Sequence, residues 1–85
     1  MAEQLVGHVT HWFARPQVAG IHIDHGVLHA GDKVHIVGHT SDIEQPVTSI
    51  EVEHQRVDEA REGDEIGVKV LDHVREGDKV YLIRN

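Results

Sequence analysis

The stretch AGDKVHIV (residues 30–37) carries the pattern that decides the fold class. After its Gly-Asp pair, Val34 and Ile36 fall on one face of an extended chain, and Lys33 and His35 fall on the other. Side chains of a β-strand alternate between its two faces, so this pattern is typical of a half-buried strand. Because glycine readily adopts a positive φ and aspartate hydrogen-bonds nearby backbone amides, the Gly-Asp pair predicts a tight turn into that strand.

The same combination of a Gly-Asp turn and an alternating strand recurs twice toward the C-terminus. Gly-Asp precedes EIGVKV (residues 65–70) and also KVYLI (residues 79–83). Together with alternation elsewhere, this predicts six strands, with a short turn at residues 56–62. The predicted strands are residues 4–13, 18–24, 32–39, 44–54, 64–71 and 78–84. Their inward positions predict a core of Val9, Ile36, Ile50, Val52, Ile66, Val68 and Val80.

The composition favours an all-β protein. Valine and isoleucine together number 20, against 4 leucines, and β-branched side chains favour strands over helices. Six short strands in 85 residues predict a small closed barrel, because closure removes exposed sheet edges. No linker or low-complexity stretch divides the chain, so we expect one domain over residues 1–85.

Several classes of protein are excluded by the sequence. There is no cysteine, which excludes disulfides, thiolate metal sites and cysteine nucleophiles. No apolar run approaches the roughly 20 residues of a membrane span, and the N-terminus lacks the apolar stretch of a signal peptide. We therefore expect a cytoplasmic domain without a membrane partner.

Blocks from the middle to the end of the chain resemble a known family. The blocks are GVLHAGDKVHIVG (residues 26–38), TSIEV (48–52) and VDEAREGDEIGV (57–68). They are similar to the second domain of elongation factor Tu and its relatives, and the resemblance covers about residues 5–84. The segments GHTSDIEQ (38–45) and EHQ (53–55) resemble stand-alone translation elongation factor-like proteins, which consist of this barrel alone. The resemblance implies a Greek-key β-barrel of the translation-factor second-domain type.

The resemblance does not extend to a nucleotide site or to the family's tRNA site. The chain has no Gly-x-x-x-x-Gly-Lys-Ser/Thr loop, so we expect no GTP and no other cofactor. In elongation factor Tu this barrel helps to hold the aminoacyl end of tRNA. Glu51 matches a glutamate of that pocket, but His54 replaces the family's arginine and Glu65 replaces its asparagine. Arginine is the residue best suited to bind a phosphate, so we do not expect tRNA in this pocket.

The charge balance also argues against nucleic acid as a partner. The net charge is −7 at pH 7, and the chain has no run of lysines or arginines that would neutralise phosphates. We expect weak or no direct binding to nucleic acid at neutral pH. Protonation of all nine histidines would bring the net charge to about +2, so the sign of the net charge changes at mildly acidic pH.

The nine histidines raise the question of a metal site. His8 and His11 are three residues apart, which places them on opposite faces of a strand. His25 and His29 flank a predicted turn, and their convergence is left open by the sequence. No Cys₂His₂ or His-Glu-x-x-His spacing exists. We therefore predict no metal site and interpret the histidines as solvated or hydrogen-bonded.

Two functions remain open. The favoured one is a non-catalytic binding module that presents loop surfaces, in residues 12–15, 39–45 and 53–55, to a protein or ribonucleoprotein partner. The predicted contact residues are Trp12, Arg15, His39, Thr40, Asp42, Gln45, Glu51, Glu53 and His54. The acidic run of residues 58–65 is either a solvated turn or a docking patch for a basic partner.

The alternative is a small enzyme or a metal-dependent accessory protein. It would use His39, Asp42, Glu53 and His54, because acid–base catalysis needs titratable groups gathered in a cleft. These four residues on one concave surface would favour the enzyme, whereas their dispersal over the barrel would favour the binding module. The binding-module hypothesis assigns no catalytic residue.

Overall fold

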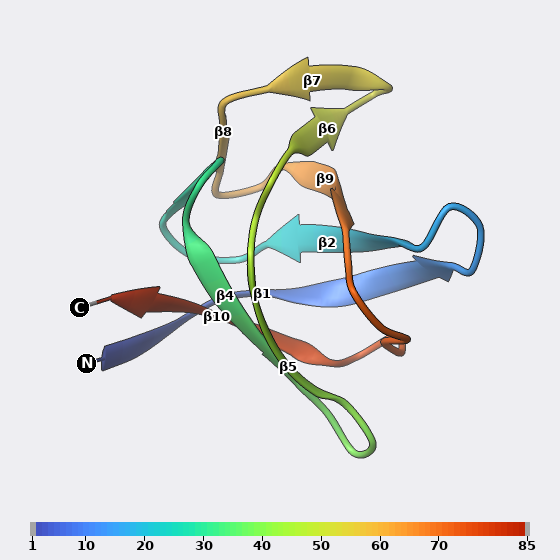
Figure 1. The fold of residues 1–85 in the computed structure, drawn as a ribbon. Helices are drawn as coiled ribbons and strands as arrows, with labels where there is room; N and C mark the ends of the chain where they lie inside the picture. The colour runs from blue at the N-terminus through green and yellow to red at the C-terminus, as the bar shows by residue number, and fades with distance from the viewer. Residues whose placement is uncertain (1, 85) are drawn as a thin grey trace.

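The computed structural model describes residues 2–84, which form ten β-strands (Figure 1). No helix long and apolar enough to cross a membrane occurs within this range. The strands are β1 (Ala2–Phe13), β2 (Val18–Ile23), β3 (Val27–His29), β4 (Lys33–Val37), β5 (Asp42–Pro46), β6 (Ile50–Val52), β7 (Gln55–Val57), β8 (Glu59–Arg61), β9 (Glu65–Lys69) and β10 (Lys79–Arg84).

Eight strands form one antiparallel sheet in the order β5-β4-β10-β1-β2-β9-β6-β7, and β3 pairs with β8 in a separate two-stranded sheet. The larger sheet curls around the core into a barrel-like fold (Figure 1). Among the described residues its two outer strands, β5 and β7, do not pair with each other. Backbone hydrogen bonds of Val47 with Gly31 and Asp32, both 2.7 Å long, tie the chain between β5 and β6 to the turn before β4.

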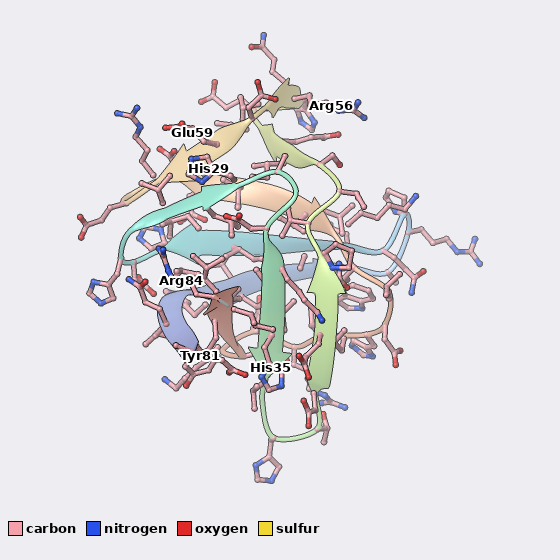
Figure 2. All side chains as sticks on the ribbon, turned by 60° about the vertical axis from the view of Figure 1, so that its left-hand side comes forward. His29, His35, Arg56, Glu59, Tyr81 and Arg84 are labelled. Carbon is pink, nitrogen blue, oxygen red and sulfur yellow. The ribbon has the colours of Figure 1, made fainter. Side chains whose placement is uncertain are left out.

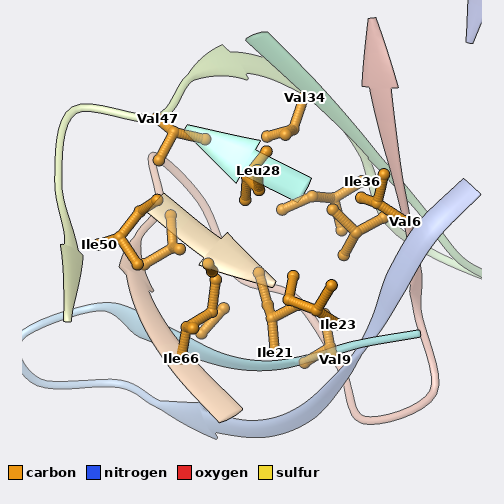
Figure 3. Packing of buried hydrophobic residues seen from close by; sticks show 14 of the residues in the cluster. Val6, Val9, Ile21, Ile23, Leu28, Val34, Ile36, Val47, Ile50 and Ile66 are labelled. Atoms are coloured by element: carbon orange, nitrogen blue, oxygen red, sulfur yellow. The ribbon is translucent and has the colours of Figure 1, made fainter. Parts of the chain in front are cut away.

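The core follows from the alternation in the sequence. In β2, β4, β9 and β10, inward residues are buried and their neighbours are more exposed, as the burial patterns of these strands show. Six of the seven predicted core residues are buried, and Val52 alone is only partly buried, packed against the edge of the cluster. Inward side chains from both sides of the curled sheet meet in one apolar cluster (Figure 3).

All three Gly-Asp pairs form the same turn, as predicted. The glycines have positive φ angles, which are 98° at Gly31, 92° at Gly63 and 93° at Gly77. In each turn the aspartate carboxylate accepts a hydrogen bond from the backbone amide three residues before it. These bonds run from His29, Arg61 and Arg75 to Asp32, Asp64 and Asp78, over 2.8, 2.8 and 2.9 Å respectively.

Two local predictions were wrong. The predicted strand 44–54 is divided into β5 and β6, because the backbone of Val47 bonds to the turn before β4 and leaves the ladder. Residues 56–62 contain the end of β7 and all of β8 instead of a turn. Strands β3 and β8 have three residues each, too few for an alternating pattern to distinguish them from a turn.

Candidate functional site

Two glycines that pair across neighbouring strands lie in a groove on the outer surface of the sheet. Gly20 on β2 and Gly67 on β9 are cross-strand partners, and both line a groove with a volume of about 460 Å³. Ala19 and Ile21, on either side of Gly20, point inward and are buried, so both glycines belong to the outward face. Because neither has a side chain, the floor of the groove at these two positions is backbone, flanked by the side chains of Thr10, His11 and Val18.

The walls of the groove come from two separate parts of the chain, within residues 10–18 and 51–66. Strand β1 and the loop after it supply one side, and β6, the β6–β7 turn and β9 supply the other. The lining residues besides the two glycines are Thr10, His11, Phe13, Arg15, Pro16, Val18, Glu51, Glu53, His54, Glu65 and Ile66. In Figure 1 the β1–β2 loop and the β6–β7 turn both lie toward the right of the molecule.

Phe13 is the main exposed apolar group of the groove, with 53% of its surface accessible. Strand alternation explains its position. Trp12 pairs with the buried Ala19 and packs against the core, whereas Phe13 pairs with Val18 on the outward face. One aromatic ring of this pair must face outward, and it is Phe13 that does so.

The β6–β7 turn holds two side chains in an uncommon backbone conformation. Val52 pairs with Gln55, which leaves Glu53 and His54 as the two turn residues, with φ angles of 51° and 66°. Two-residue hairpins with positive φ at both positions prefer Asn-Gly, and a side chain in the left-handed region costs about 1–2 kcal/mol. Both residues nevertheless line the groove.

The groove has an acidic side and a single permanently charged base. Glu51, Glu53 and Glu65 line the side formed by β6, the β6–β7 turn and β9, and Arg15 lines the side formed by the β1–β2 loop. The carboxylate of Glu65 lies 2.7 Å from Nδ1 of His22. Within residues 2–84, neither Glu51, Glu53 nor Arg15 forms an ion pair.

Beside the groove, histidines and carboxylates pair on the outer face of β1 and β2. Nδ1 of His8 lies 2.7 Å from the Asp24 carboxylate, and Nε2 of His22 lies 3.7 Å from the same group. The hydrogen bond from His8 lowers the pKa of Asp24 below its usual value. No three histidine, aspartate or glutamate side chains between residues 2 and 84 are placed to hold a metal ion.

A second pairing lies at the other end of the molecule. His35 on β4 lies 3.0 Å from Glu3 of β1 through Nδ1 and 2.5 Å from Asp42 of β5 through Nε2. Hydrogen bonds to Asp42 and then to Glu3 raise the pKa of His35 above its usual value. Figure 2 shows His35 low on the molecule, whereas His29 and Glu59 lie together near the top, with Nε2 of His29 3.6 Å from the Glu59 carboxylate.

The structure divides the predicted contact residues among several places. Four of them, Arg15, Glu51, Glu53 and His54, line the groove. His39 and Thr40 are exposed in the β4–β5 turn, at the bottom of Figure 1, far from the other two hairpin tips.

The remaining three predicted contact residues have partners inside the protein. Asp42 hydrogen-bonds to His35. The indole of Trp12 stacks on His73, with ring centroids 5.0 Å apart. Gln45 is buried, donates to the Lys69 carbonyl over 2.9 Å and accepts from the Leu71 amide over 2.8 Å. The single surface expected from residues 12–15, 39–45 and 53–55 is therefore not formed.

None of the other nine groove residues was among the predicted contact residues, although Phe13 lies within the predicted surface 12–15 and Glu65 within the acidic run 58–65. Phe13 was detectable, because strand alternation requires one residue of the Trp12-Phe13 pair to face outward. Gly20 and Gly67 gave no signal alone, since their effect comes from facing each other across β2 and β9. The four residues of the enzyme hypothesis are also separated, with Glu53 and His54 in the groove and His39 and Asp42 on the β4–β5 hairpin.

Comparisons with known proteins agree with this architecture. The fold matches the C-terminal domain of a putative U32 peptidase from Geobacillus thermoleovorans with a TM-score of 0.87 and 18% identity, over 95% of this chain and 93% of that one. A selenomethionine variant of the same domain matches with a TM-score of 0.85 and 19% identity, over 91% of this chain and 96% of that one.

Sequence relatives include an uncharacterised protease of Methanocaldococcus jannaschii, 38% identical over 80 residues, and a collagenase of Porphyromonas gingivalis, 40% identical over 77 residues. The matches cover 93% and 89% of this chain but only 19% and 21% of those proteins, so the chain spans about a fifth of their length. The family model for elongation factor Tu domain 2 matches residues 17–72, and the chain belongs to that family.

Proposed function

We propose that this chain is a non-catalytic binding module that holds a segment of polypeptide in the groove between the β1–β2 and β6–β7 hairpins. The observation that carries the proposal is the groove itself, with a backbone floor at Gly20 and Gly67 and an exposed Phe13 on its wall. A floor without side chains lets a ligand approach the sheet closely, and an exposed aromatic ring is a common anchor at interfaces.

Polypeptide is the ligand class that the surroundings favour. The lining combines apolar surface at Phe13, Val18 and Pro16 with carboxylates and imidazoles, which suits a chain of mixed side chains. The net charge of −7 opposes a polyanion such as nucleic acid. Sequence relatives named as a protease and a collagenase contain a matching segment as about a fifth of their length, which supports polypeptide as the ligand.

The dispersal of the four candidate acid–base residues supports binding rather than catalysis. His39 and Asp42 lie on the β4–β5 hairpin and do not line the groove that holds Glu53 and His54. A general acid or base must reach the same reacting atoms as its partners. We therefore assign no catalytic residue to this chain.

Titration of the ¹⁵N-labelled protein with short synthetic peptides, each with a central phenylalanine or leucine, tests the proposal. We expect the amide signals of Gly20 and Gly67 to move in a saturable way, and Phe13→Ala to weaken binding about tenfold because it removes the exposed ring. Thr40→Ala is the matched control, since Thr40 is exposed on the distant β4–β5 turn. Shifts confined to that turn, or none at millimolar peptide, would overturn the proposal.

A further inference from the structure

We infer that the groove selects polypeptide segments in which a lysine or arginine stands beside an apolar side chain. This inference rests on the proposed polypeptide-binding function and concerns which segments are bound. Its basis is that the apolar part of the lining and the free carboxylates lie in one groove.

The charges of the lining favour a cationic ligand. Three carboxylates against one guanidinium leave the groove with a charge of −2 when its histidines are neutral. Of the three carboxylates, only that of Glu65 forms an ion pair, with Nδ1 of His22 at 2.7 Å. Glu51 and Glu53 have no ion-pair partner within the described part of the chain. The rest of the chain is also acidic, so its field adds to the attraction.

The two free carboxylates are held on the same side of the groove by the local fold. Glu51 lies on β6, where it pairs with Gly67 of β9 across the sheet. Glu53 follows two residues later at the first position of the β6–β7 turn, with a φ of 51°. Both residues line the groove, so a lysine or arginine of a bound segment would meet two carboxylates on this side, with Arg56 opposite Glu51 on the neighbouring strand β7.

The opposite part of the lining suits an apolar side chain. Phe13 and Val18 are cross-strand partners on the outward face, and Pro16 continues this surface into the β1–β2 loop. A ligand side chain placed over the bare backbone of Gly20 and Gly67 would contact this wall. The ring of Phe13 also attracts a nearby ammonium or guanidinium group through its π face.

Three synthetic peptides separate the contributions of charge and apolar contact. Each has the same phenylalanine in a Gly-Ser frame, flanked by two lysines, two glutamines or two glutamates, and carries a fluorescent label for anisotropy. We expect the lysine peptide to bind at least fivefold more tightly than the glutamine peptide, and the glutamate peptide to bind most weakly. The preference should shrink when NaCl rises from about 50 mM to about 500 mM.

The variant Glu51→Gln with Glu53→Gln tests whether the groove carboxylates cause the preference. We expect it to weaken the lysine peptide about fivefold and to leave the glutamine peptide unchanged. The matched control is Glu44→Gln with Glu62→Gln, which changes the net charge equally at two exposed residues outside the groove. We expect the control to change affinity less than twofold.

The outcomes distinguish the two proposals. If all three peptides shift Gly20 and Gly67 with equal affinity, or if the glutamate peptide binds best, the charge selection is wrong and polypeptide binding stands. If the control variant weakens the lysine peptide as much as Glu51→Gln with Glu53→Gln does, the selection comes from net charge and the groove assignment is wrong. If no peptide binds, both proposals are overturned.

Discussion

The β4–β5 and β6–β7 hairpins are both short, polar and rich in predicted contact residues. They differ in whether their polar side chains have partners inside the protein. In the β4–β5 hairpin, Asp42 bonds to His35 and the buried Gln45 bonds to backbone around β9. In the β6–β7 hairpin, Glu53 and His54 line a groove, and Glu53 has no ion-pair partner within residues 2–84. A polar side chain is available to a ligand only when the fold has not already given it a partner.

The same contrast applies to the glycines of the two regions. Gly38, at the start of the β4–β5 turn, packs against the carboxylate of Asp78, so that a Cβ atom there would lie 1.8 Å from Oδ1. Gly20 and Gly67 line the groove, where an added Cβ would meet side-chain atoms of β1 and β2 at 3.3 Å, a tight contact but no overlap. A side chain at the first glycine would overlap Asp78, whereas one at the other two would require neighbouring side chains to shift by only a few tenths of an ångström.

The substitution Gly38→Ala, which tests the packed region, should destabilise the protein most. The added methyl group would displace the buried Asp78, whose carboxylate accepts the Arg75 amide, so we expect a loss of about 3 kcal/mol in unfolding free energy. Urea denaturation followed by Trp12 fluorescence measures it. Gly20→Ala is the comparison and should lose less than about 1 kcal/mol. Equal losses in the two variants would contradict the proposed difference between the regions.

A smaller effect of opposite sign is expected in the β6–β7 turn. The double substitution Glu53→Asn with His54→Gly places the preferred residues at two positions with positive φ. We expect unfolding free energy to rise by about 1 kcal/mol, while affinity for the lysine peptide falls because a carboxylate leaves the groove. Denaturation and anisotropy on the same samples measure both changes. A double variant that is less stable than the original chain would show that this turn is not strained.

The smallest effect is a pH dependence at His35. Its pKa is raised in the folded state by Asp42 and Glu3, so its contribution to stability is fully present below the unfolded value near 6.5 and is lost as pH rises through the folded pKa. We therefore expect His35→Gln to destabilise the protein more at about pH 5.5 than at about pH 8.5.

Thermal denaturation at the two pH values measures this difference. His39→Gln, on the exposed β4–β5 turn, is the matched control, because His39 makes no ion pair with any residue from 2 to 84. We expect the same loss at both pH values for this control. A His35→Gln loss that grows with pH would reverse the sign and contradict the assigned interaction.

Much of the fold was predictable because its determinants are local. The positive φ of Gly31, Gly63 and Gly77 and the aspartate bonds that follow them depend on neighbouring residues only. Alternation within a strand decides which side chains are buried, and six of the seven predicted core residues confirm it. The interruption of the predicted strand 44–54 at Val47 was not predictable, because it depends on backbone hydrogen bonds to the turn before β4.

The candidate site was predictable only in part, because it too depends on contacts between residues far apart in the sequence. Arg15, Glu53 and His54 were chosen as polar residues near turns, and Glu51 was chosen from the family resemblance. The sequence could not separate them from Gln45, whose side-chain amide hydrogen-bonds to the backbone of Lys69 and Leu71. The partners of a side chain lie on other strands, and their identity depends on how the strands pair.

The sequence alone accounts for the Gly-Asp turns, the alternating strands, their apolar face and the net negative charge. Strand pairing in three dimensions sets the register that puts Gly20 opposite Gly67 and brings Phe13 and the β6–β7 turn to the same groove. Turn geometry and alternation depend on adjacent residues, whereas a groove depends on which distant strands pair and in which register.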